Sequence, residues 1–214
     1  MDRDEVWRTI DQQRVELADL METFTEADWE TPSLCEGWRV REVAALLTLA
    51  HTTLPEALGS AIRARGGFNR MIYQTAIWQA ELPVEDYSVL LRAMVGSRRK
   101  APFISDLEPL IDQLVHGQDM VVPLGRTREM SPEAAATAAQ RAWSMSYPFG
   151  AKRRLHGFTL AATDHPWTMG DGARVEGPVR ALLMLVTGRH VVLPELGGPG
   201  AEELRTRLQP SPVS

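Results

Sequence analysis

Asp112, His116 and Asp119 are the side chains whose types and spacing most directly suggest chemistry. On an α-helix, at about 100° per residue, they fall within roughly 60° of one another. A carboxylate and an imidazole at positions i and i+4 can both reach one metal ion, because this spacing stacks them one turn apart. Asp119 lies about 10 Å further along the axis than Asp112, so we expect it to orient His116 by a hydrogen bond. The alternatives for the three residues are an exposed polar stripe and a histidine that is satisfied by a neighbouring acid.

Three more residues are candidates for a site, each with a structural alternative. His51 is placed on a helix among apolar residues, where it is either a metal ligand or a histidine satisfied by its neighbours. Cys35 is in an apolar loop near Arg39 and is either a reactive thiol or a small packing residue. Arg189 follows an apolar helix, where it either binds a substrate carboxylate or is favoured by the helix dipole.

Composition narrows the classes of function. The chain has 214 residues, a net charge of −5, five histidines and one cysteine. The acidic balance argues against nucleic-acid binding, and a single cysteine excludes an internal disulfide framework or a multi-cysteine metal site. No apolar run approaches the roughly 20 residues that span a bilayer, and the first residues lack the apolar stretch of a signal peptide. We therefore expect a cytoplasmic protein with no membrane role.

Apolar periodicity predicts the elements that position these residues. Helices are expected near 6–24, 40–58, 69–80, 83–95, 107–118 and 131–146. The pattern changes after about residue 150, with a strand in 155–162, a hairpin around Asp171-Gly172 and an apolar helix opened by Pro178. The sequence thus predicts a mainly α protein, with a helical domain at 1–148 and a small α/β domain at 153–210.

Common nucleotide-binding and hydrolase motifs are absent from the sequence. It contains no Gly-x-Gly-x-x-Gly, no P-loop, no Gly-x-Ser-x-Gly and no His-Glu-x-x-His. These absences lower the support for nucleotide binding and for serine-hydrolase chemistry.

Four stretches in order carry a family resemblance that covers nearly the whole chain. They are PSLCEGWRVREVAALLTLAH, GFNRM, DQLVHGQDMVVPLG and ATDHPWTMGDGARVEGPVRALLMLVTGR. Together they resemble the actinobacterial maleylpyruvate isomerase family of mycothiol-dependent enzymes, in the DinB-like superfamily. The resemblance implies an N-terminal four-helix metal-binding bundle followed by a small C-terminal α/β domain.

The resemblance also implies a divalent metal, zinc or nickel, that activates the thiol of mycothiol. Its ligands would be a histidine on the second helix and the two members of an acid-x-x-x-His motif. Asp112 and His116 match the motif, but Leu46 stands where the helix-two histidine is expected, eight residues after Trp38. His51 lies five residues beyond Leu46, about 140° around the helix, and becomes a ligand only if the helix is shifted or distorted.

The sequence leaves three functions open. The first is a thiol-dependent isomerase or S-transferase for a small carboxylate or electrophile, with metal ligands Asp112, His116 and His51, and with His116, Asp119 and Arg189 as catalytic candidates. The second is a metal-free isomerase or cyclase using Asp112, His116 and Asp119 for acid–base work. The third is a non-catalytic binding protein. We expect a small-molecule partner, and a monomer or homodimer.

Overall fold

The structure is a computed structural model that describes residues 1–49, 77–100 and 104–208. Its contacts separate the chain into a helical unit, Asp2–Glu129, and a C-terminal unit that begins at Met130. The predicted helix at 69–80 and the second half of the one at 40–58 fall largely outside the described residues. Among the described residues, no helix is both long and apolar enough to cross a membrane.

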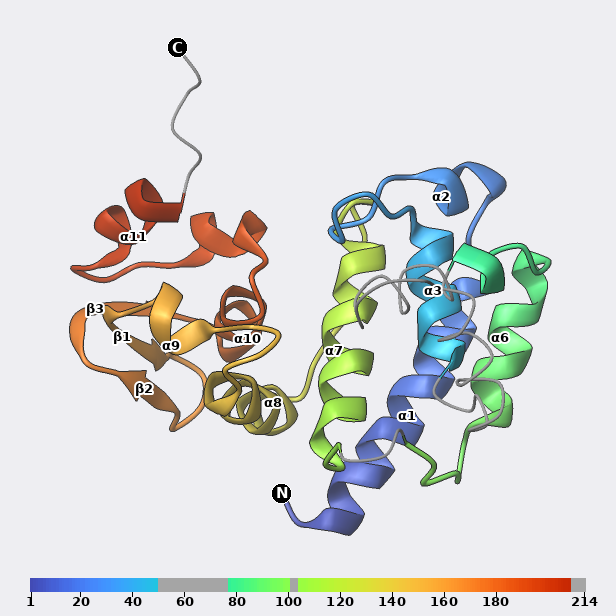
Figure 1. Cartoon of the computed structure of the whole chain (residues 1–214), viewed down its shortest axis with the longest axis horizontal. Helices are drawn as coiled ribbons and strands as arrows, with labels where there is room; N and C mark the ends of the chain where they lie inside the picture. Colours follow the sequence, from blue (N-terminus) through green and yellow to red (C-terminus); the bar gives the residue numbers. More distant parts are fainter. Residues whose placement is uncertain (50–76, 101–103, 209–214) are drawn as a thin grey trace. The chain divides into compact units, whose positions relative to one another are not determined.

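Four helices of the helical unit form the expected bundle. They are α1 (Arg3–Met21), α3 (Val40–Thr48), α6 (Val84–Ala93) and α7 (Leu107–Val121). Helices α1 and α3 each contact both α6 and α7, so the four surround one core (Figure 1). This core includes Leu17, Val43, Leu91 and Met120, all fully buried. Burial of such side chains is the main force that holds the bundle together.

N-terminal capping residues determine where α1 and α2 (Glu26–Glu30) begin. Asp2 and Glu5 form a capping box at the start of α1, and Thr25 and Asp28 form another at α2. These side chains satisfy N–H groups that have no partner within the helix. Helix α8 (Pro132–Ser144) begins where its proline signal predicts, although its N-cap residue makes no side-chain capping bond.

The C-terminal unit joins helices to a small mixed sheet. Its elements are α8, α9 (Ala151–Arg154), β1 (Gly157–Ala162), β2 (Thr168–Gly170), β3 (Gly172–Gly177), α10 (Val179–Val186), the 3-10 helix η2 (His190–Glu195) and α11 (Ala201–Leu208). Helix α10 is apolar and contacts both α8 and β1. The described chain is thus mainly helical with a small C-terminal three-stranded sheet, as the sequence predicts.

The hairpin predicted around Asp171-Gly172 is wrong. Strand β1 lies between β2 and β3, pairing antiparallel with β2 and parallel with β3. The chain crosses the beginning of β1 at residues 170–172, and this crossing needs glycine: a Cβ on Gly172 would lie 2.1 Å from the carbonyl oxygen of Gly157. Asp-Gly therefore marks a close crossing of two backbones here, not a two-residue turn between paired strands.

The division between the units differs from the predicted domain boundary. The sequence places the boundary between residues 148 and 153, which assigns α8 to the first domain. In the structure α8 packs on α10, and the division falls between Glu129 and Met130. The alanine-rich face of α8 allows this close packing, because seven of its residues are buried, among them Ala135 and Ala139.

Helix α7 passes unusually close to another segment at Gly117. A Cβ on Gly117 would lie 2.6 Å from Nη1 of Arg128 and 3.3 Å from Cδ2 of Leu17. The Arg128 guanidinium also contacts the side-chain oxygen of Gln13 on α1, and burial lowers its pKa to about 10. Gly117, which lies between His116 and Asp119 in the sequence, therefore lets the desolvated Arg128 pack directly against α7.

Replacing Gly117 with alanine is expected to destabilise the helical unit. The added methyl group must displace the Arg128 guanidinium, so we expect the free energy of unfolding in urea to fall by about 1–3 kcal/mol. Gly197→Ala is the control, because a Cβ added at Gly197 would meet no other atom within 4 Å. Equal stability of the two variants would contradict this account of Gly117.

Candidate functional site

Three side chains that could do chemistry meet at the surface of α7. The thiol of Cys35 donates to Oδ2 of Asp119 across 3.1 Å, and its Sγ lies 3.7 Å from Nδ1 of His116. Nδ1 of His116 is 2.9 Å from the same Asp119 oxygen. We call these three residues the thiol–imidazole group.

Helix α7 supplies two members of the group at i and i+3. His116 is partly exposed, with 18% of its side chain accessible, whereas Asp119 is fully buried. Residues three apart on a helix lie on adjacent turns of one face, which explains their contact. The hydrogen bond expected between His116 and Asp119 from their spacing is present in the structure.

The loop 31–39 supplies Cys35. Its ends are joined by a bridge between Pro32 and Arg39. Inside it, the Ser33 hydroxyl donates to the carbonyl of Trp38 and accepts from the N–H of Cys35. The loop is also tied to α7, because the N–H of Leu34 donates to the carbonyl oxygen of Asp119 at 3.1 Å. Cys35 therefore reaches Asp119 from a closed loop whose backbone contacts the same residue.

The electrostatics of the group centre on the buried carboxylate of Asp119. Burial alone would lower the pKa of His116, since it disfavours the charged imidazolium. Hydrogen bonds and charge interactions with Asp119 and Cys35 outweigh burial and raise the pKa of His116 from 6.5 to about 10. Without a metal, His116 is therefore a cation paired with Asp119 at neutral pH.

The three donor atoms also fit the demands of a metal ion. Sγ, Nδ1 and Oδ2 form a triangle, all within 4.8 Å of one another. Around a tetrahedral zinc ion, sulfur, nitrogen and oxygen ligands are separated by about 3.3–3.6 Å, so shifts of a few tenths of an ångström would suffice. Three protein ligands and an open fourth position are typical of catalytic zinc sites.

The ligand set implied by the resemblance is not assembled among the described residues. Asp112 is exposed on α7 and is not part of the metal-competent group. Leu46 is half-buried on α3 and offers no ligand atom. His51 lies outside the described residues. His116 alone is shared by the predicted ligands and the observed group.

Arg189 belongs to the C-terminal unit. Its Nη1 donates to the carbonyl oxygen of Thr187, just after α10. This contact agrees with the structural alternative for a cation at a helix C-terminus. Its role as a substrate clamp stays a prediction.

Cys35 is the member that sequence reasoning did not join to the group. It is 84 residues from Asp119, and no local spacing connects them. The available signals were indirect: Cys35 is the only cysteine, and its loop is rich in large apolar residues, which indicates a packed loop.

Replacing Asp119 with asparagine is expected to lower the pKa of His116 from about 10 to 6.5 or below. The variant removes the negative charge that opposes burial. An NMR titration of the imidazole in chelator-treated protein measures this pKa. His190, whose pKa burial lowers, is the internal control and should not move. A His116 pKa that stays near 10 would show that Asp119 is not its cause.

The same pairing makes stability depend on pH. Because the pKa of His116 in the fold, about 10, exceeds its ordinary value of 6.5, its stabilising effect is complete below pH 6.5. That contribution is lost as the pH rises toward 10. Urea unfolding of wild type and Asp119→Asn at several pH values should show a smaller loss over this range in the variant.

Comparison with known proteins identifies the first part of the chain. Residues 10–102 match the family model of the mycothiol maleylpyruvate isomerase N-terminal domain. The match begins within α1, includes α2, α3 and α6, and ends before α7. No curated protein and no solved structure matches the chain at a comparable level. Residues 10–102 are thus similar to the N-terminal domain of the mycothiol maleylpyruvate isomerase family, which has a DinB-like helical fold.

Proposed function

We propose that the chain is a thiol-dependent isomerase or S-transferase for a small electrophilic carboxylate, with the thiol–imidazole group as its reactive centre. The observation that carries this proposal is the convergence of Cys35, His116 and Asp119. The description of the matched family model names mycothiol and maleylpyruvate. These two compounds are therefore the thiol and the substrate to test first.

The exposure of the three residues suggests a division of roles. Cys35 and His116 are partly accessible to a small molecule, whereas Asp119 is not. Asp119 therefore acts through its neighbours: it orients the His116 ring and accepts the hydrogen bond of the Cys35 thiol. His116 and Cys35 are the side chains that a substrate or a cofactor thiol would meet.

A divalent metal, zinc or nickel, is the cofactor we propose for this centre. It would be held by Cys35, His116 and Asp119. When bound, the metal would stabilise the thiolate of mycothiol, which is the reactive form of that thiol. The soft sulfur ligand favours zinc over magnesium or calcium, which prefer oxygen. His116 must lose its proton to bind a metal, so occupancy should increase with pH.

A metal-free enzyme is the second candidate, and one observation favours it. Cys35 and His116 are both within hydrogen-bonding distance of Asp119, and the pKa of His116 is about 10. In this case the charged His116 donates hydrogen bonds to a substrate carboxylate or enolate, with Asp119 holding the ring in place. Metal content separates the two candidates.

Metal content is the first test of the proposed centre. We expect purified wild-type protein to carry about one equivalent of zinc or nickel per chain by elemental analysis. Cys35→Ser, His116→Ala and Asp119→Asn should each lose most of it, since each removes one of three ligands. Asp112→Asn is the control and should keep the metal. A metal-free wild type would favour the second candidate. Loss of the metal in Asp112→Asn would instead show that Asp112 is a ligand, as the family resemblance implies.

Activity is the second test. With maleylpyruvate and mycothiol, wild-type protein should catalyse isomerisation or thiol conjugation. His116→Ala should lower kcat/KM by about 100-fold or more, because it removes a ligand or proton donor at the centre. Asp112→Asn should stay within a few-fold of wild type. Equal activity of wild type and His116→Ala would exclude the thiol–imidazole group as the reactive centre.

A further inference from the structure

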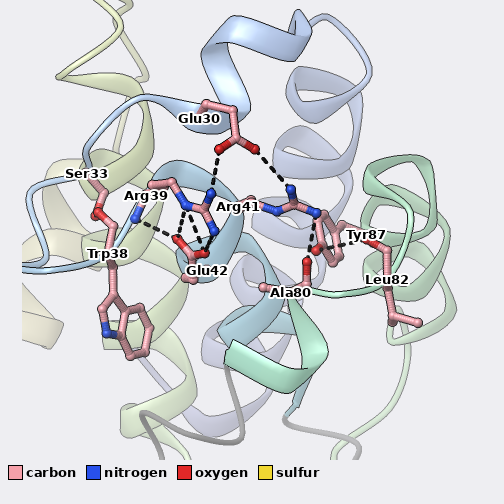
Figure 2. A network of polar contacts seen from close by, with 9 residues as sticks. All are labelled: Glu30, Ser33, Trp38, Arg39, Arg41, Glu42, Ala80, Leu82 and Tyr87. Carbon is pink, nitrogen blue, oxygen red and sulfur yellow. Dashed lines mark hydrogen bonds and ion pairs between the residues drawn. The ribbon is translucent and has the colours of Figure 1, made fainter.

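A network of charged side chains joins the two ends of the loop that carries Cys35. Glu30 is the last residue of α2, directly before the loop, and Arg39 is the residue before α3. Figure 2 shows Arg39 between the carboxylates of Glu30 and Glu42. We call Glu30, Arg39 and Glu42 the Arg39 clamp.

The contacts within the Arg39 clamp are directional. Nη1 of Arg39 is 2.5 Å from a carboxylate oxygen of Glu30, and Nε is 3.0 Å from Oε1 of Glu42. The Arg39 backbone N–H donates to the other oxygen of Glu42 at 2.7 Å. Glu42 thus binds both the main chain and the side chain of Arg39, which fixes this residue more strongly than a single surface ion pair would.

The clamp is built on a buried carboxylate. The side chain of Glu42 is only 3% exposed, and that of Arg39 is 45% exposed. Hydrogen bonds to Glu42 and Glu30 raise the pKa of Arg39 above its ordinary value, and the bond to Glu42 makes the larger contribution. A buried charge must be paired, so Glu42 requires Arg39 in this position.

Neighbouring contacts attach the clamp to the bundle. Arg41 binds the second oxygen of Glu30 at 3.0 Å and donates to the carbonyl of Ala80 at 2.8 Å (Figure 2). On the other side of the loop, Leu34 and Cys35 contact Asp119. The loop is therefore fixed at its ends by charged side chains and at its middle by α7.

We propose that the Arg39 clamp is a positioning device that holds the Cys35 thiol against Asp119 and His116. The proposal deepens the proposed function and rests on it for the chemical role of Cys35, but the position of the thiol can be measured without any activity. Arg39 is a positioning residue: its contacts are to the ends of the loop, and it acts on the centre through the placement of Cys35.

Thiol reactivity tests the proposal directly, because Cys35 is the only cysteine in the chain. In metal-free wild-type protein, the thiol is half-buried and hydrogen-bonded to Asp119, so Ellman's reagent should modify it slowly. In Arg39→Ala the loop opens more often, and the rate should increase by about tenfold or more. Arg39→Lys keeps the charge without the planar fork and should give an intermediate rate.

Arg92→Ala is the matched control. Arg92 lies in the same helical unit and also bridges two carboxylates, Asp19 and Glu22, at 2.6 and 2.8 Å. Its removal should leave the rate of thiol modification within about twofold of wild type. Unfolding curves of both variants show whether they lose similar stability.

Two results would overturn the proposal. One is an unchanged thiol reactivity in Arg39→Ala, and the other is an equal increase in Arg92→Ala. If Arg39→Ala does not fold, Glu30→Gln weakens the exposed half of the clamp and must still accelerate modification. Increased reactivity in the Arg39 variants, combined with no metal and no isomerase activity in wild type, would uphold the positioning role while rejecting the proposed function.

Discussion

The fully buried carboxylate of Asp119 is the constraint on which the site depends. A charge removed from water must be compensated by hydrogen bonds or by an opposite charge. In this structure His116 and Cys35 both contact one oxygen of Asp119, while the loop that carries Cys35 also binds its backbone carbonyl. The need to compensate this buried charge therefore brings a thiol, an imidazole and a carboxylate together.

Much of the fold could be predicted, because its signals are local. Apolar residues at helical spacing predict α1, α6 and α7, and Pro132 after a serine predicts the start of α8. The errors concern the packing of elements distant in sequence. Asp171-Gly172 has the composition of a hairpin turn, yet β1 occupies the place between the strands. A local sequence pattern does not indicate which strand lies between two others in the sheet.

Two of the three residues of the candidate site could be predicted in the same way. His116 and Asp119 share a helical face, so their contact follows from spacing. That face also includes Asp112, but Asp112 is exposed while Asp119 is buried. The difference arises from the loop 31–39, which contacts α7 at Asp119, and helical spacing cannot predict what covers a helix. Cys35 could not be assigned for the same reason.

The thiol–imidazole group also connects the site to the way the chain folds. The contact between Cys35 and Asp119 spans 84 residues. Closing so long a segment costs conformational entropy that local helix formation does not recover, so such contacts form late relative to the helices. The centre therefore exists only in the assembled bundle. An isolated α7 would retain His116 and Asp119 at the correct spacing, but it would lack the sulfur atom that completes the group.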